Sequence, residues 1–190
     1  DASVAHYPDN TRPQTAEEMR DTLTSEMNRW VDGMMSACAG RVQAWDLINE
    51  AISGGGNVNG YYDLQHSTPG STDFFWQDYL GSEQYGPIVE QAARKAWAKY
   101  GGKPEDLKLF INDYNLESDW DQNKKLSSLI YWIGVWEKNC AKIDGIGSQM
   151  HVAYYANESI MRSKAKAMVN MMHMMANTGK FVRISELDMG

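Results

Sequence analysis

Carboxylates and amides stand where four short apolar runs of the sequence end. The first run ends in Asn49 and Glu50, and the last ends in Glu186 and Asp188. Two glutamates that face each other across a site can hydrolyse a glycosidic bond, because one carboxyl protonates the leaving oxygen while the other attacks the sugar or activates water. Glu50 and Glu186 are therefore the candidate catalytic pair.

The two middle runs end in side chains of the same chemical kinds. They lead into Asn112, Asp113, Tyr114 and Asn115 in one case and into Gln149 and His151 in the other. Any one of these residues, taken alone, is typical of a helix cap or a turn. Four runs that all end this way indicate a shared site, because a carboxylate directly after apolar strand residues costs free energy unless it is paired or hydrogen-bonded.

The same residue types allow a rival chemistry, hydrolysis assisted by a divalent metal. Its ligands would come from Asp46, Glu50, Asp113, His151, Glu186 and Asp188. The sequence holds no HxH or HExxH spacing, and His151 is the one histidine that follows an apolar run. His66 and His173 are expected to be structural or solvated, and His6 is given no role. The pattern favours sugar chemistry without a metal site.

These side chains need elements that bring them together, and helical and strand patterns alternate along the chain. Helices are predicted at Ala16 to Ala37, Pro87 to Tyr100, Asp121 to Cys140 and Glu158 to Asn177, and strands at Val42 to Ile48, Leu107 to Ile111, Ile143 to Val152 and Phe181 to Leu187. The alternation indicates a parallel sheet with crossover helices, in which ligands bind at the carboxyl ends of the strands. Four strands allow either a small doubly wound sheet or half of a barrel.

Two of the predicted helices carry distinctive side-chain patterns. In the first, Thr15 and Glu18 make a capping box at the start, and one face is apolar through Met19, Leu23, Met27, Trp30 and Met34. The last helix has a methionine stripe, Met168, Met171, Met172 and Met175. This stripe is expected to fill the core rather than to bind a metal or cofactor.

The overall composition is that of a globular protein and limits the classes of partner. Of the 190 residues, 43% are hydrophobic and 23% charged, which excludes a disordered chain. The net charge of -7 and the lack of a basic run argue against a nucleic-acid partner. No apolar run approaches the roughly 20 residues that span a bilayer, and the first ten residues do not form a signal peptide. Cys38 and Cys140 are expected to be free thiols, with a disulfide as the alternative.

Four segments of the chain resemble family 10 glycoside hydrolases, the main (β/α)₈ xylanase family. Residues 45–51, WDLINEA, resemble its WDVVNEA segment, and residues 110–115, FINDYN, resemble its YINDYN strand. Residues 145–151, GIGSQMH, resemble GIGSQSH, and residues 184–188, ISELD, resemble ITELD. The segments follow the family's order, and each lies at a predicted strand.

The resemblance implies an α/β fold that is part of a (β/α)₈ barrel. The four segments correspond to strands four to seven of the family's barrel, so strands one to three and strand eight are absent from this chain. Residues 1–190 are then one catalytic-domain fragment, with residues 1–14 as an opening segment and residues 15–190 as the half-barrel. Insertion of a module after the third strand, such as a carbohydrate-binding module, is our hypothesis for the origin of the opening segment. An extracellular, periplasmic or cell-surface location is expected because polymeric xylan does not enter cells.

The resemblance also implies a role for each candidate residue in a retaining endo-1,4-β-xylanase. Glu186 is the nucleophile and Glu50 the acid/base. The supporting set is Asn49 for the sugar 2-hydroxyl, His151 and Asp188 on the nucleophile, Gln149 near the acid/base, and Tyr114 and Asn115 along the aglycone side. The expected substrate is xylan or a xylo-oligosaccharide, and the mechanism requires no metal or organic cofactor.

Other functions stay open at this point. The same fold can serve as a carbohydrate-binding pseudoenzyme or as a β-1,4-glucan hydrolase, and a metal-dependent hydrolase is the rival from another class. The stretch from Ser53 to Asp78 is rich in aromatic residues. These rings either stack on sugars in the aglycone subsites or pack the loop onto the barrel.

Overall fold

The computed structural model describes residues 12–38 and 40–190. Most of the predicted opening segment, residues 1–14, and His6 lie outside these described residues. By its internal contacts the chain divides into two compact units, one formed by Asp1–Gln43 with His66–Leu107 and the other by Ala44–Gln65 with Lys108–Gly190. The strands found in the described residues belong to the second unit.

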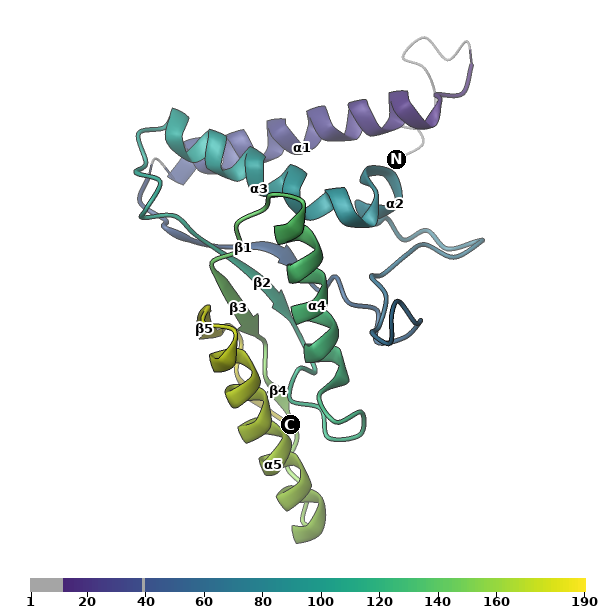
Figure 1. The fold of residues 1–190 in the computed structure, drawn as a ribbon, viewed down its shortest axis with the longest axis vertical. Coiled ribbons are helices and arrows are strands. Elements are labelled where there is room, and N and C mark those ends of the chain that lie inside the picture. The colour runs from purple at the N-terminus through teal and green to yellow at the C-terminus, as the bar shows by residue number, and fades with distance from the viewer. Residues whose placement is uncertain (1–11, 39) are drawn as a thin grey trace. The chain divides into compact units, whose positions relative to one another are not determined.

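A parallel four-stranded sheet forms the centre of the second unit (Figure 1). Its strands are β1 (Ala44–Asn49), β2 (Lys108–Asp113), β3 (Gly145–Ser148) and β5 (Phe181–Ile184), hydrogen-bonded in that order. All four predicted strands are therefore confirmed. A second pair was not predicted: β4 (His151–Val152) lies parallel to β6 (Asp188–Met189). Each of these two strands follows the carboxyl end of a longer one.

Two helices connect the strands of this unit as crossovers. Helix α4 (Lys124–Lys138) lies between β2 and β3 in the chain, and α5 (Glu158–Asn177) lies between β3 and β5. Asn157 caps α5 by accepting hydrogen bonds from the backbone amides of Ser159 and Ile160 at 2.9 and 3.3 Å. One face of the sheet and both helices bury large apolar side chains: Ile48, Leu109, Ile111, Ile146, Leu126, Leu129, Ile133, Trp136, Met171 and Met175. Phe110, on the other face of β2, is buried as well. The methionine stripe is therefore only partly core, since Met172 is exposed.

The opposite face of the sheet is concave. Asp46 on β1 forms an ion pair with Arg183 on β5, although two strands lie between them. In a flat sheet three strand spacings of about 4.8 Å would hold those backbones roughly 14 Å apart. Arg183 also lies 4.6 Å from the ring centroid of Phe110 on β2. The sheet therefore curls toward this face as a barrel does, which favours half of a barrel over a doubly wound sheet.

The outer strands of the curved sheet are open to solvent. Phe181, Val182 and Ile184 on β5 are exposed, and so are Ala44, Asp46 and Asn49 on β1. An outer strand carries unpaired backbone groups, and apolar side chains there are an association hazard unless another element covers them. In the described residues no further strand pairs with β1 or β5.

The first unit consists of helices. Helix α1 (Ala16–Cys38) packs along α3 (Ser82–Lys99), and the short α2 (Gln77–Leu80) precedes α3 (Figure 1). Asp32 of α1 joins them by accepting bonds from Lys99 Nζ and the Tyr100 hydroxyl, both at 2.8 Å. The predicted capping box is confirmed, because the amide of Glu18 donates to Thr15 Oγ1 at 3.2 Å and the amide of Thr15 donates to Glu18 Oε2 at 2.9 Å.

Two details of this unit differ from the sequence prediction. Helix α3 begins at Ser82 rather than at Pro87, so the proline lies inside the helix. On α1, Leu23 and Met27 are buried as predicted, but Trp30 and Met34 are exposed. Periodicity shows which side of a helix is apolar and does not show how much of that side a partner covers.

The structure also shows the state of the two cysteines and whether any described helix could span a membrane. Cys38 and Cys140 are free thiols. Among residues 12–38 and 40–190, no helix has the length and apolar character needed to cross a bilayer.

Candidate active site

The floor of the site is formed by amide side chains at the carboxyl ends of β1 and β2. Asn112 Nδ2 donates to Asn49 Oδ1 at 2.8 Å, and the backbone amide of Glu50 donates to the carbonyl of Asn112 at 2.8 Å. The second bond extends the β1–β2 ladder by one residue, so Glu50 is fixed directly to the end of the sheet. Gln149 Nε2 reaches the same Asn49 oxygen at 3.3 Å.

The chain turns sharply at this end of three strands. Glu50, Asn115 and Met150 all have φ between 51° and 58°, which is the left-handed region that residues other than glycine and asparagine seldom occupy. Such a conformation costs on the order of 1–3 kcal/mol and persists only where the surroundings hold it. At Glu50 the surroundings include Gln65, whose Nε2 donates to the Glu50 carbonyl at 2.5 Å.

Side chains connect the two candidate glutamates through an unbroken series of contacts. Gln149 Nε2 donates to Glu50 Oε1 at 2.8 Å, and Gln149 Oε1 lies 3.0 Å from His151 Nε2. The same His151 nitrogen lies 3.3 Å from Glu186 Oε2. The structure therefore brings Glu50 and Glu186 to the same site, with Gln149 and His151 between them.

The neighbours of His151 favour its protonated form. Its Nδ1 lies 3.0 Å from Asp188 Oδ2, while its Nε2 faces the oxygen of Gln149 and the carboxylate of Glu186. Both ring nitrogens thus face acceptors, and only the protonated ring can donate to all of them. The hydrogen bond to Asp188, helped by the charges of Asp188 and Glu186, raises the pKa of His151 above its usual value.

The short β4–β6 pair explains how His151 and Asp188 meet. These two residues are partners in its register, so their side chains lie on the same face of the pair. Glu186 comes two residues before Asp188, between β5 and β6. His151, Glu186 and Asp188 are all exposed, so this part of the site is open to solvent.

Tyr114 and Asn115 stand apart from the network that joins the two glutamates. Lys125 Nζ lies 3.3 Å from the ring centroid of Tyr114 and forms an ion pair with Asp113 at 2.8 Å. Asn115 lines a separate cavity of about 180 Å³, which His151 also lines. The structure thus gathers Asn49, Gln149, His151 and Asp188 around the glutamates, while Tyr114 and Asn115 lie to the side.

The ligand set of the rival metal chemistry is not assembled. Asp113 is buried and accepts from Lys125 and from the backbone amides of Ile52 and Tyr114. Burial raises the pKa of Asp113, and the ammonium of Lys125 opposes that effect. The carboxylate of Asp46 is paired with Arg183. Within the part of the chain that the structure describes, no three histidine, cysteine or acidic side chains gather as a metal site.

Sequence reasoning missed several residues that build the floor. Ser185 Oγ donates to Asn112 Oδ1 at 2.7 Å, and a Cβ at Gly147 would lie 2.3 Å from that same oxygen. Gly147 therefore leaves the space that the Asn112 side chain occupies. The glycines at 145 and 147 within an apolar run were the available signal, because a glycine inside a strand often marks a close approach of another group.

Residues 61 and 62 attach their loop to α4. The rings of Tyr61 and Tyr131 are stacked with centroids 4.5 Å apart. The amide of Tyr62 donates to Ser128 Oγ at 2.8 Å, and its carbonyl accepts from Trp132 Nε1 at 3.0 Å. All three partners lie on α4. For the Tyr61 ring the packing alternative therefore holds.

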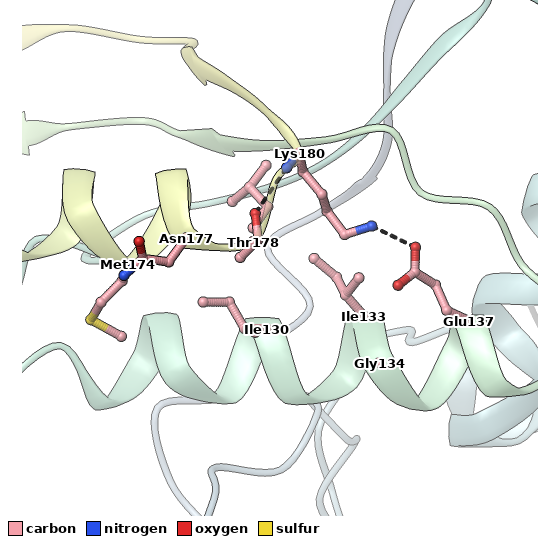
Figure 2. Close-up of a pocket in the computed structure, with 9 residues that line it drawn as sticks. Ile130, Ile133, Gly134, Glu137, Met174, Asn177, Thr178 and Lys180 are labelled. Atoms are coloured by element: carbon pink, nitrogen blue, oxygen red, sulfur yellow. Dashed lines mark hydrogen bonds and ion pairs between the residues drawn. The ribbon is translucent and has the colours of Figure 1, made fainter.

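A further cavity of about 470 Å³ lies between α4 and α5, and its groups do not suit hydrolytic chemistry. Figure 2 shows the side chains of Ile130 and Ile133 pointing from α4 toward Met174 and Thr178. At one end Lys180 Nζ pairs with Glu137 at 2.5 Å. The walls are mostly aliphatic and the one carboxylate is paired, so this space is a gap in helix packing.

Comparisons with known proteins agree over nearly the whole chain. A family model described as "Glycosyl hydrolase family 10" matches residues 6–190. "Endo-1,4-beta-xylanase C" of Paenibacillus barcinonensis is 29% identical over 191 residues, which cover 95% of this chain and 15% of that protein. "Endo-1,4-beta-xylanase 2" of Claviceps purpurea is 31% identical over 172 residues, covering 89% of this chain and 42% of that protein.

The fold matches solved structures over a similar extent. The structure described as "GH10 from Paenibacillus barcinonensis" aligns with a TM-score of 0.64 and 26% identity, covering 98% of this chain and 47% of that one. The chain thus spans about half the length of that structure and less than half the length of the two relatives above.

Proposed function

The chain belongs to glycosyl hydrolase family 10, and from this membership we propose that it carries the catalytic pair of a retaining endo-1,4-β-xylanase. Its fold is part of a (β/α)₈ barrel. The observation that carries the proposal is the series of contacts from Glu50 through Gln149 and His151 to Glu186. Double displacement at a sugar carbon requires two carboxyl groups in the same site. Here a shared set of side chains holds both.

In the proposed reaction Glu186 attacks the anomeric carbon while Glu50 protonates the leaving oxygen. A covalent glycosyl-enzyme forms on Glu186, and Glu50 then takes a proton from the water that hydrolyses it. Once Glu186 is esterified its negative charge is gone, so Glu50 no longer has an anionic neighbour and serves as the base. A retaining site needs the two carboxyls roughly 5–5.5 Å apart.

The surrounding side chains support both steps. His151, bonded to Asp188, orients the carboxyl of Glu186 for attack. The Nε2 group of Gln149 donates a hydrogen bond to Oε1 of the Glu50 carboxyl and holds it in place. The oxygen of Asn49 already accepts from Asn112 and Gln149, so its Nδ2 group is the part that donates to the 2-hydroxyl of the sugar. No metal or organic cofactor takes part.

The proposed substrate is xylan or a xylo-oligosaccharide, and the rest of a barrel is proposed to complete the binding site. The exposed apolar side chains on β5 and the chain's coverage of about half of a solved relative support this second part. Because xylan is a polymer that does not enter cells, we place the protein outside the cell, in the periplasm or on the cell surface.

The roles of the two glutamates are tested with substrates that differ in their leaving group. Glu186→Ala should abolish hydrolysis of every substrate, whereas Glu50→Ala should keep activity on dinitrophenyl xylobioside, whose leaving group needs no protonation. Each variant is assayed in the shortest form that releases reducing sugar from xylan, either the chain alone or the chain joined to its flanking coding sequence. Equal losses for both variants on the aryl substrate would show that the assignment is wrong, and sugar binding without hydrolysis in every form would indicate a binding protein.

A further inference from the structure

An ion pair joins the first and the last strand of the curved sheet across its concave face. Arg183 on β5 pairs with Asp46 on β1, although β2 and β3 lie between these strands in the sheet. Asp46 comes four residues before Glu50, and Arg183 comes three residues before Glu186. We call Asp46 and Arg183 the cross-strand pair. It connects the two strands that lead into the candidate glutamates.

The two middle strands hold Arg183 in place. Its guanidinium carbon lies 4.6 Å from the ring centroid of Phe110 on β2. That ring fills the space beside Gly145 on β3, where a Cβ would lie 2.2 Å from the Cε1 atom of Phe110. A glycine inside a strand often marks such a close approach. Each of the four strands therefore contributes one residue to the arrangement around the cross-strand pair.

An irregularity in β1 turns Asp46 and Asn49 toward the same face of the sheet. In a regular strand, residues three positions apart point to opposite faces. The register of β1 against β2 shifts between Asp46 and Ile48, as it does at a β-bulge, where one strand gains a residue and a side chain is re-aimed. Asp46 consequently meets Arg183, while Asn49 accepts from Asn112 in the floor of the site.

The cross-strand pair contributes little to stability. The side chain of Arg183 is 30% exposed and that of Asp46 is 36% exposed, and ion pairs this open to solvent add little to the free energy of unfolding. The Nε atom of Arg183 is in addition buried without a hydrogen-bond partner among the described residues, which costs free energy. The geometry that the pair imposes on the sheet explains its presence better than stability does.

We propose that Asp46 and Arg183 are positioning residues, which set the separation of Glu50 and Glu186. This inference rests on the proposed function and extends it. A retaining site needs its carboxyls roughly 5–5.5 Å apart, and a separation of roughly 6.5–9.5 Å suits inversion instead. The curvature of the sheet sets the distance between its outer strands, and a direct link between β1 and β5 fixes that curvature.

The test compares two substrates that differ in how many carboxyl groups they need. Hydrolysis of xylopentaose needs Glu186 for attack and Glu50 for protonation, whereas release of dinitrophenolate from dinitrophenyl xylobioside needs only the attack. A misplacement of about 1 Å costs about a hundredfold in rate. For Arg183→Met and for Asp46→Asn, kcat/KM should therefore fall about 10- to 100-fold on xylopentaose, and the loss on the aryl substrate should be at least about threefold smaller.

Three further variants separate positioning from a general defect. Arg183→Lys keeps the cation and should recover most of the activity on xylopentaose. The Arg183→Met/Asp46→Asn double variant should lose no more than either single variant, because both changes remove the same contact. Lys180→Met is the matched control. Lys180 directly precedes β5 and pairs with Glu137 on α4 at 2.5 Å, so its kcat/KM should stay unchanged on both substrates.

Each variant is assayed in the same shortest active form as the glutamate variants, and urea unfolding reports whether it folds. Equal losses on the two substrates would show a general folding defect and would overturn the positioning role. Asp46→Asn is nearly isosteric and decides the question even if Arg183→Met does not fold, and its full activity on xylopentaose would also overturn that role. A wild-type protein inactive on both substrates would overturn the proposed function itself, and this inference with it.

Discussion

Gly147→Ala is the substitution whose effect the floor of the site predicts most directly. The new methyl group would lie 2.3 Å from Asn112 Oδ1 and 3.1 Å from its Cγ. Ordinary contact between such atoms begins near 3.5 Å, so the carboxamide must retreat by about 1 Å. Asn112 is buried against Asn49 and Ser185, and it has little room in which to move.

The cost of that movement has two parts. Overpacking a well-filled site costs typically about 1–3 kcal/mol. The retreat also strains the Asn112–Asn49 and Ser185–Asn112 hydrogen bonds, each worth about 1 kcal/mol. Together they predict a loss of about 2–4 kcal/mol in the free energy of unfolding. Displacement of Asn49 should in addition lower kcat/KM on xylo-oligosaccharides more than tenfold.

Urea unfolding of matched variants checks this reasoning. Gly134→Ala on α4 is the control, because no atom lies within 4 Å of a Cβ built there, and it should stabilise the protein by about 0.5–1 kcal/mol through helix propensity. In an Asn112→Ala background the cost of Gly147→Ala should shrink to below about 1 kcal/mol, since the clashing group is absent. A Gly147→Ala protein within 0.5 kcal/mol of wild type would refute the tight packing inferred for this floor.

Two further predictions concern charged residues. Asp188→Asn should lower the pKa of His151, because the hydrogen bond that is the main cause of its elevation is lost. The protonated ring stabilises the fold below its ordinary pKa, and this stabilisation is lost as pH rises through the folded-state pKa. In the variant that loss should therefore occur at a lower pH. An NMR titration of His151 measures this shift, and an unchanged titration would contradict the assigned partner. Lys125→Met should cost about 3–5 kcal/mol by leaving Asp113 buried and unpaired. The Lys125→Met/Asp113→Asn double variant should recover much of that loss in the same unfolding assay, and no recovery would show that the charge is not the cause.

The order and the type of the main helices and strands could be predicted from the sequence. Helix α5 has both of its predicted ends, because Asn157 is a strong cap and Gly179 stops the pattern. Each of the four long strands lies within or next to an apolar run. Such signals are local, and a single chain displays them without any knowledge of the tertiary fold.

Contacts between distant segments could not be predicted in the same way. Asp113 was included in a metal set, yet its partner is Lys125 on the following helix. Nothing in the residues around Asp113 distinguishes a carboxylate that is neutralised by a lysine from one that is available to a ligand. The β4–β6 pair was missed for a related reason, since two-residue strands have too few positions to show an alternating pattern.

The ion pair between Asp46 and Arg183 bears on the order in which the sheet folds. The two residues are 137 positions apart in the chain, and the entropy lost on closing so long a loop is large before any contact rewards it. Strands β2, β3 and β5 can instead join one after another through short helical crossovers, each a more local step. The ion pair can then form with little further loss of chain entropy. It is a late, non-local contact, so removing it should speed unfolding more than it slows folding.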